Sequence, residues 1–155
     1  PRGLDPGAWV ALMGSWRDAA IPVVQLSVRP RLGPAHHYQL GQLLAPLREE
    51  GILIIGSGSF THDLASFRTS GGRIDAPEPD WVHSFAEWMA AALREGRVED
   101  LLNYRRLAPE AVHNHPTEEH LLPLYVALGA GPETVKHLHQ STTYGILRMD
   151  AFAFG

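Results

Sequence analysis

The stretch HNHPTEEHLLPL, residues 113–124, concentrates side chains that could do chemistry. Imidazole and carboxylate groups bind metal ions and transfer protons near neutral pH. The spacing does not match the HExxH zinc motif, because His115 and His120 stand five positions apart and would not share one face of a helix. The cluster therefore indicates either a metal or proton-transfer site, or a polar helix start that is rich in histidine.

The helix-start interpretation does not explain His120, although as a zinc motif by itself the cluster is a weak signal. Thr117 is a good N-cap, and Glu118 and Glu119 in a first helical turn would complement the helix dipole, which explains both acids without a site. His120 would stand at the third helical position, where a protonated imidazole meets the dipole unfavourably. A neutral imidazole is expected there, and neutral imidazole is the form that binds metals.

A second candidate lies in GILIIGSGSFTHDL, residues 51–64, where His62 and Asp63 follow an apolar run and a Gly-Ser-Gly-Ser turn. In open α/β sheets, ligands bind at the carboxyl ends of the strands, so this turn would lie at a ligand-binding edge. A phosphate loop is disfavoured, because the run lacks both the GK[ST] ending and the GxGxxG spacing. A glycine-rich turn with an incidental histidine remains the alternative.

The elements that would position these histidines form a strand–helix–strand unit. Residues Ile21–Val28 and Ile52–Ile55 are continuous apolar runs that predict buried strands. Between them, residues 35–51 carry leucines at helical spacing, with a kink expected at Pro46 and an end at Gly51. Short connections of this kind predict an α/β fold with a mostly parallel sheet flanked by helices.

The rest of the chain continues the α/β pattern. Residues 81–96 predict an amphipathic helix whose aromatic stripe we assign to the core. A short helix is expected over residues 98–104, another over residues 121–128, and a final strand over residues 145–154.

Composition limits the classes of function. The 155 residues have the length of one domain, and 45% hydrophobic with 19% charged residues is typical of globular chains. A net charge of -4 and the lack of a long apolar run argue against nucleic-acid and membrane partners. With no cysteine, any metal must bind His, Asp or Glu, and a cytoplasmic location is expected.

Five blocks, in this order, resemble the class III extradiol ring-cleavage dioxygenases, in the 4,5-DOPA dioxygenase-like branch of the LigB-type fold. The blocks are GLDPGAWVAL, IPVVQLSV, IIGSGSFTHDL, HPTEEHLLPLYVALGA and YGILRMDAFAFG. The resemblance implies ring cleavage of catechol-type aromatic substrates, with insertion of both atoms of O2 and a metal held by histidines. The implied cofactor is non-haem Fe(II), and Zn(II), which is redox-inactive, can occupy such a site.

The resemblance also assigns roles to residues. His62 matches a histidine of the family's active centre, either a metal ligand or a catalytic proton-transfer group, and the sequence leaves both roles open. His120 matches a histidine that coordinates the metal. His115 matches a position that is not always histidine, and we take it only as a candidate pocket residue.

Two departures from the family pattern qualify these expectations. The family's N-terminal half, with further metal histidines in GHGSP-like and SAHW-like stretches, has no counterpart in this sequence, and Pro6 replaces a pocket histidine. We therefore interpret residues 1–155 as the C-terminal part of a dioxygenase domain, incomplete and weakly active alone, whose partners would be a catechol, O2, a second copy or a separate N-terminal half. The alternatives are a non-catalytic α/β binding or oligomerisation module and, less favoured, a metal-dependent hydrolase.

Overall fold

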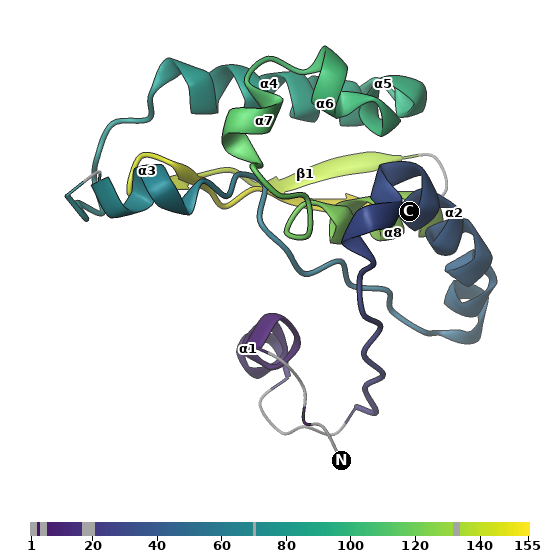
Figure 1. The fold of residues 1–155 in the computed structure, drawn as a ribbon. Helices are drawn as coiled ribbons and strands as arrows, with labels where there is room; N and C mark the ends of the chain where they lie inside the picture. The colour runs from purple at the N-terminus through teal and green to yellow at the C-terminus, as the bar shows by residue number, and fades with distance from the viewer. Residues whose placement is uncertain (1–2, 4–5, 17–20, 70, 132–133) are drawn as a thin grey trace.

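The computed structural model describes residues 3, 6–16, 21–69, 71–131 and 134–155. Figure 1 shows the strands between two groups of helices, with α4 to α7 on one side and α2 and α8 on the other. Helix α1, Pro6–Ser15, lies apart from both groups, and residues 21–29 run as an extended segment toward α2. Helices therefore flank a small sheet on both sides, as an α/β fold requires.

The first helical group supplies most of the main hydrophobic core, which also includes Phe60 and Leu121. It comprises α4, Asp80–Arg94; α5, Val98–Leu102; α6, Tyr104–Leu107; and α7, Ala111–Asn114. On α4, Phe85, Met89 and Ala92 are fully buried, which confirms the amphipathic helix expected there. The aromatic stripe is core only in part, because Trp81 and Trp88 are half-buried.

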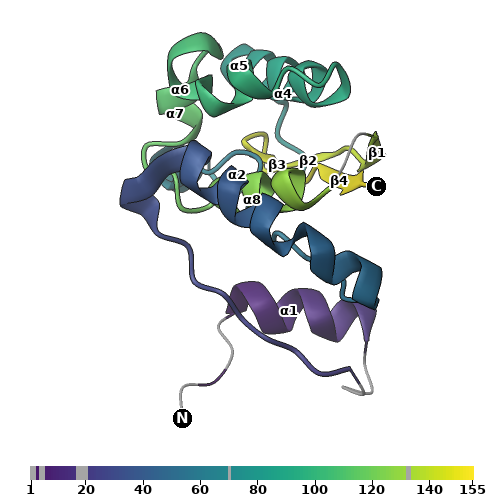
Figure 2. The same ribbon diagram turned by 90° about the vertical axis from the view of Figure 1, so that its right-hand side faces the viewer.

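The second group consists of α2, Gly33–Leu44, and α8, Leu122–Ala130, shown side by side in Figure 2. The short 3-10 helix η1, Pro30–Leu32, leads into α2. Helix α2 gives way at Ala45 to a second 3-10 helix, η2, Ala45–Glu50, which contains Pro46 and ends at Gly51 with φ 80°. The expected kink and glycine stop are thus confirmed.

Two short antiparallel ladders make up the described sheet. Strand β1, Val135–His139, pairs with β4, Ala151–Phe154; β2, Thr142–Thr143, pairs with β3, Leu147–Arg148. The single strand expected near the C-terminus is therefore divided into β3 and β4.

The prediction of strands over Ile21–Val28 and Ile52–Ile55 is wrong in this structure. Both segments are extended but belong to no ladder, and the mostly parallel pairing does not occur among the described residues. A strand is stabilised by hydrogen bonds to a neighbour and by burial of its faces. The described chain supplies no strand beside these segments, and their side chains remain open to solvent, with Val24 88% and Leu53 66% exposed.

Candidate active site

His62 and His120, the two histidines singled out from the sequence, lie against each other. Their ring centroids are 3.6 Å apart and the ring planes are inclined by 21°. His62 precedes helix α3, Leu64–Thr69, and His120 stands in the turn before α8. Thr117 and His120 therefore precede the helix, which begins at Leu122; Thr117 does not cap it, and its hydroxyl contacts Glu119 instead.

Backbone hydrogen bonds hold the loop that carries His62 against the segment that carries His120. The Ser59 N–H donates to the carbonyl of His120 at 2.8 Å, and the His62 N–H donates to the carbonyl of Asn114 at 2.8 Å. Gly58 lies so close that an added Cβ would stand 2.1 Å from the His120 carbonyl oxygen. The two loops are therefore in fixed register, and any side chain at position 58 would separate them.

His115 fastens the same two segments from inside the core. It is fully buried, and its Nε2 lies 2.9 Å from the carbonyl oxygen of Phe60. Because a carbonyl only accepts, Nε2 carries the proton and Nδ1 is the bare nitrogen; Nδ1 is buried without a hydrogen-bond partner among the described residues. His115 is thus a buried structural partner of the Phe60 loop rather than the open pocket residue considered from the sequence.

Thr61 and Arg148, which the sequence reading missed, tie the His62 loop to the C-terminal strands. The buried Thr61 hydroxyl donates to the carbonyl of Ile146 at 2.8 Å and accepts from the N–H of Arg148 at 2.9 Å. The buried Arg148 guanidinium pairs with Asp150 at 2.7 Å and with Glu78 at 3.1 Å. In the sequence, Arg148 stands in a charged RMD triplet within an apolar C-terminal segment. That segment predicted a strand, but it did not indicate which residues would pair with Arg148.

The pKa values of His62 and His115 are both lowered, which favours their neutral forms. Burial lowers the pKa of His62, and the neighbouring His120 lowers it further, against the opposing effect of Glu119. Burial also lowers the pKa of His115, to about 4. Neutral rings carry an unprotonated nitrogen, so they can accept a proton or bind a metal ion.

The donor set is too small for a complete metal centre. His62 and His120 offer two nitrogen donors, while the nearest carboxylate oxygen of Glu119 lies 3.9 Å from Nε2 of His120. In the part of the chain that the structure describes, no group of three or more His, Asp or Glu side chains could hold a metal ion. The pair therefore supplies at most two nitrogen donors, fewer than a complete metal centre needs.

The other features considered from the sequence do not join the pair. His113 stacks on Trp81 with centroids 3.8 Å apart, and His137 stacks on Phe152 and contacts Asp150. Pro6 begins α1, whose next residue, Gly7, accepts a hydrogen bond from the Ser57 hydroxyl. The HNHPTEEH cluster thus divides: His120 faces His62, His115 is buried, and His113 packs on an indole.

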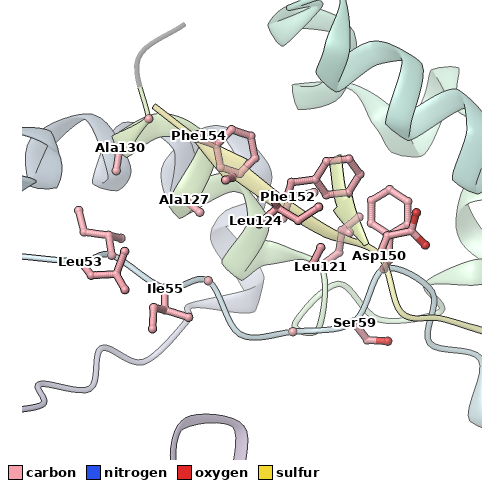
Figure 3. A pocket seen from close by; sticks show the side chains of 18 of the residues that line it. Leu53, Ile55, Ser59, Leu121, Leu124, Ala127, Ala130, Asp150, Phe152 and Phe154 are labelled. Atoms are coloured by element: carbon pink, nitrogen blue, oxygen red, sulfur yellow. The ribbon is translucent and has the colours of Figure 1, made fainter. Parts of the chain in front are cut away.

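A cavity of about 460 Å³ opens beside the pair, with His120 among its lining residues. Figure 3 shows Leu53 and Ile55 on one side of it and Phe152 and Phe154 on the other. Most of the lining is apolar, so the cavity continues the hydrophobic surface of the extended segment at residues 52–56.

Comparison with known proteins places the chain in a dioxygenase family. Residues 1–152 match the family described as the catalytic LigB subunit of aromatic ring-opening dioxygenase. A 4,5-DOPA dioxygenase extradiol of Beta vulgaris is 44% identical over 99% of this chain and 56% of its own length, and one of Escherichia coli K12 is 37% identical over 99% and 57%. The chain thus spans about half the length of these relatives.

A solved structure agrees with the fold. The crystal structure of an uncharacterized protein of Escherichia coli K12 matches with a TM-score of 0.87 at 36% identity, covering 100% of this chain and 64% of that one. The α/β class and the LigB-type fold expected from the sequence are thereby confirmed.

Proposed function

The chain belongs to the family of the catalytic LigB subunit of aromatic ring-opening dioxygenases, and on this premise we propose that it forms part of an extradiol dioxygenase active centre. The substrate class is catechol-type aromatics such as DOPA, and both atoms of O2 enter the product. The observation that carries the proposal is the stacked pair of His62 and His120, at 3.6 Å, beside a largely apolar cavity.

His62 is our candidate for proton transfer. Burial lowers its pKa and so favours the neutral ring, which can accept a proton from a catechol hydroxyl and return it later. Positioned acid–base groups of this kind contribute about 10²–10⁴-fold to a rate. His62 remains an alternative metal ligand.

His120 is our candidate metal ligand, and the cofactor is non-haem Fe(II), with Zn(II) as a redox-inactive occupant. Fe(II) in such a centre would supply the positions at which catechol and O2 bind. Two imidazoles leave the coordination incomplete, so the remaining donors must come from outside the described residues. We therefore expect the chain alone to be weakly active.

The remaining partners follow from composition. No described helix is long and apolar enough to cross a bilayer. With a net charge of -4 and no cysteine, we place the protein in the cytoplasm, without a nucleic-acid partner and with self-association as a further expectation.

An anaerobic mixture of the protein, Fe(II) and DOPA, then opened to air, tests the proposal by the yellow colour of the ring-opened product. We expect faint colour from the chain alone and strong colour once the part of the Beta vulgaris relative that it does not match is added. His120→Ala should abolish the increase in product formation that the added polypeptide causes. His113→Ala, which alters a ring stacked on Trp81, should leave that increase unchanged. Equal rates for wild type and His120→Ala would refute the role of His120.

The second candidate is a non-catalytic α/β module. Pro6 in place of a pocket histidine and the incomplete donor set favour it. Absence of colour with and without the added polypeptide would support this reading.

A further inference from the structure

The cavity beside the histidine pair lies between two extended backbones. One wall is the segment at residues 52–58 and the other is strand β4, while α8 contributes Leu124 and Ala127. Figure 3 shows the segment that carries Leu53 and Ile55 on one side of the opening and the strand that carries Phe152 and Phe154 on the other. The arrangement resembles a sheet from which a strand has been left out.

Strand β4 presents a hydrogen-bonding edge to this cavity. Val135 stands opposite Phe154, and the Gly155 N–H donates to the carbonyl of Thr134, so Phe152 and Phe154 direct their own N–H and C=O groups away from β1. Arg48, which lines the cavity, donates to the Phe154 carbonyl at 3.2 Å, which places that edge on the cavity side. The backbone N–H groups of Phe152 and Phe154, which point toward the cavity, have no acceptor among the described residues.

The opposite wall is held in place but unpaired. The Ile52 N–H donates to Leu47, and residues 53–56 make no backbone hydrogen bond to another described segment. Gly56 packs so closely on α8 that an added Cβ would lie 2.3 Å from the Pro123 carbonyl oxygen, which fixes the segment on that side. On the open side, Leu53 is 66% and Ile55 is 50% exposed.

We infer that this cavity is the seat of an extended, apolar β-strand that pairs with residues 52–56 on one side and with the outward N–H groups of β4 on the other. Two neighbouring strands lie about 4.7–4.9 Å from a strand between them, and apolar side chains of the inserted strand would cover Leu53, Ile55 and Phe152. The inference goes beyond the proposed reaction and does not depend on it.

The comparisons indicate where such a strand comes from. The solved Escherichia coli protein reproduces the whole of this chain, yet this chain covers only 64% of it. The Beta vulgaris relative likewise extends well beyond the 56% that is matched. We assign the strand to this additional portion of the family domain, supplied in the same or a separate polypeptide.

Co-expression tests the inference. The tagged chain would be produced together with the part of the Beta vulgaris relative that it does not match, and hydrogen exchange would be measured on the purified complex. We expect the amides of Phe152 and Phe154 to exchange at least about tenfold more slowly than in the chain alone. The amide of Ala153, which already points at β1, serves as an internal control and should change much less.

Two matched variants distinguish binding in this cavity from nonspecific hydrophobic association. Leu53→Glu places a charge on the cavity wall, whereas Leu43→Glu places one on an exposed residue of α2, 78% accessible, outside the cavity. Both sites are solvent-exposed in the chain alone, so both variants should fold. We expect Leu53→Glu to weaken the complex by at least about 100-fold, because the charge would be buried unpaired, and Leu43→Glu to leave it within about threefold.

Several results would overturn the inference. One is failure of the co-expressed polypeptides to associate, and another is slower amide exchange that is confined to segments other than β4. A Leu53→Glu complex with the same affinity as the Leu43→Glu complex would also contradict the inference. A homodimer of this chain that protects Phe152 and Phe154 equally well would assign the seat to a second copy instead. None of these measurements uses ring cleavage as a readout, so the two proposals succeed or fail separately.

Discussion

At the scale of single residues, three histidines that lie close in sequence or in space have different surroundings. His62 and His120 are partly exposed and stacked, so their nitrogens remain available to a ligand. His115 is fully buried, and its proton is committed to the Phe60 carbonyl. Burial and hydrogen bonding, rather than residue type, therefore decide which imidazole can do chemistry.

The buried His115 predicts a pH dependence of stability. Its pKa is lowered to about 4 in the folded chain, against an unfolded value of 6.5. The unfolded state therefore takes up a proton first as the pH falls, so stability is complete above pH 6.5 and is lost progressively toward pH 4. At about 1.4 kcal/mol per unit of pKa, the loss is on the order of 3 kcal/mol.

Urea denaturation at several pH values would measure this effect. His115→Gln keeps an N–H donor for the Phe60 carbonyl but does not titrate, so its stability should fall less steeply between pH 6.5 and 4. Parallel profiles for the two proteins would show that His115 is not the titrating group.

At the scale of elements, contact between the α2 and α8 backbones supports the segment that carries His120. A Cβ at Gly41 would lie 2.2 Å from the Val126 carbonyl oxygen, and one at Gly129 would lie 2.1 Å from that of Tyr38. Any larger residue at either position would force the helices apart. The turn at His120 leads directly into α8, so a shift of this helix would also move the imidazole.

Gly129→Ala should therefore destabilise the fold, by at least about 2 kcal/mol, because overpacking here meets backbone rather than a flexible side chain. Gly14→Ala is the matched control: it lies in α1 with no atom within 4 Å of an added Cβ, and alanine favours a helix. Thermal unfolding followed by circular dichroism would compare the two. A Gly129→Ala protein as stable as wild type would mean that the helices are free to separate.

At the scale of the whole molecule, two features occur together among the described residues. The apolar segments at residues 21–28 and 52–55 have no strand beside them, and the histidine pair offers only two nitrogen donors. Both features would follow if the family's sheet and metal centre were built from more polypeptide than these 155 residues. Within the described residues, the fold sets His62 against His120 and gathers no group of three metal-binding side chains.

The chain alone should accordingly bind Zn(II) or Fe(II) weakly, with a dissociation constant above about 1 µM, since structural and catalytic centres use three or four protein donors. Isothermal titration calorimetry would measure this affinity, with His83→Ala, which alters an exposed histidine, as the control. Submicromolar binding that His120→Ala abolishes would contradict the expectation.

The sequence by itself determined the features that depend on local chemistry. The helix over residues 81–96, the kink at Pro46 and the stop at Gly51 follow from side-chain spacing and from backbone preferences that neighbours in space do not alter. His62 and His120 were selected by residue type and by family resemblance, and the structure does bring their rings together.

Tertiary structure decided everything that depends on a partner elsewhere in the chain. An apolar, β-branched run such as Ile52–Ile55 forms a strand only when another backbone lies beside it, and none does among the described residues. The burial of His115 and the hydrogen bond from Thr61 to Ile146 likewise depend on segments that are distant in sequence. Hydrogen bonds between such segments leave no local pattern in the sequence. The sequence therefore shows which donors and acceptors are present, whereas their pairing depends on the tertiary structure.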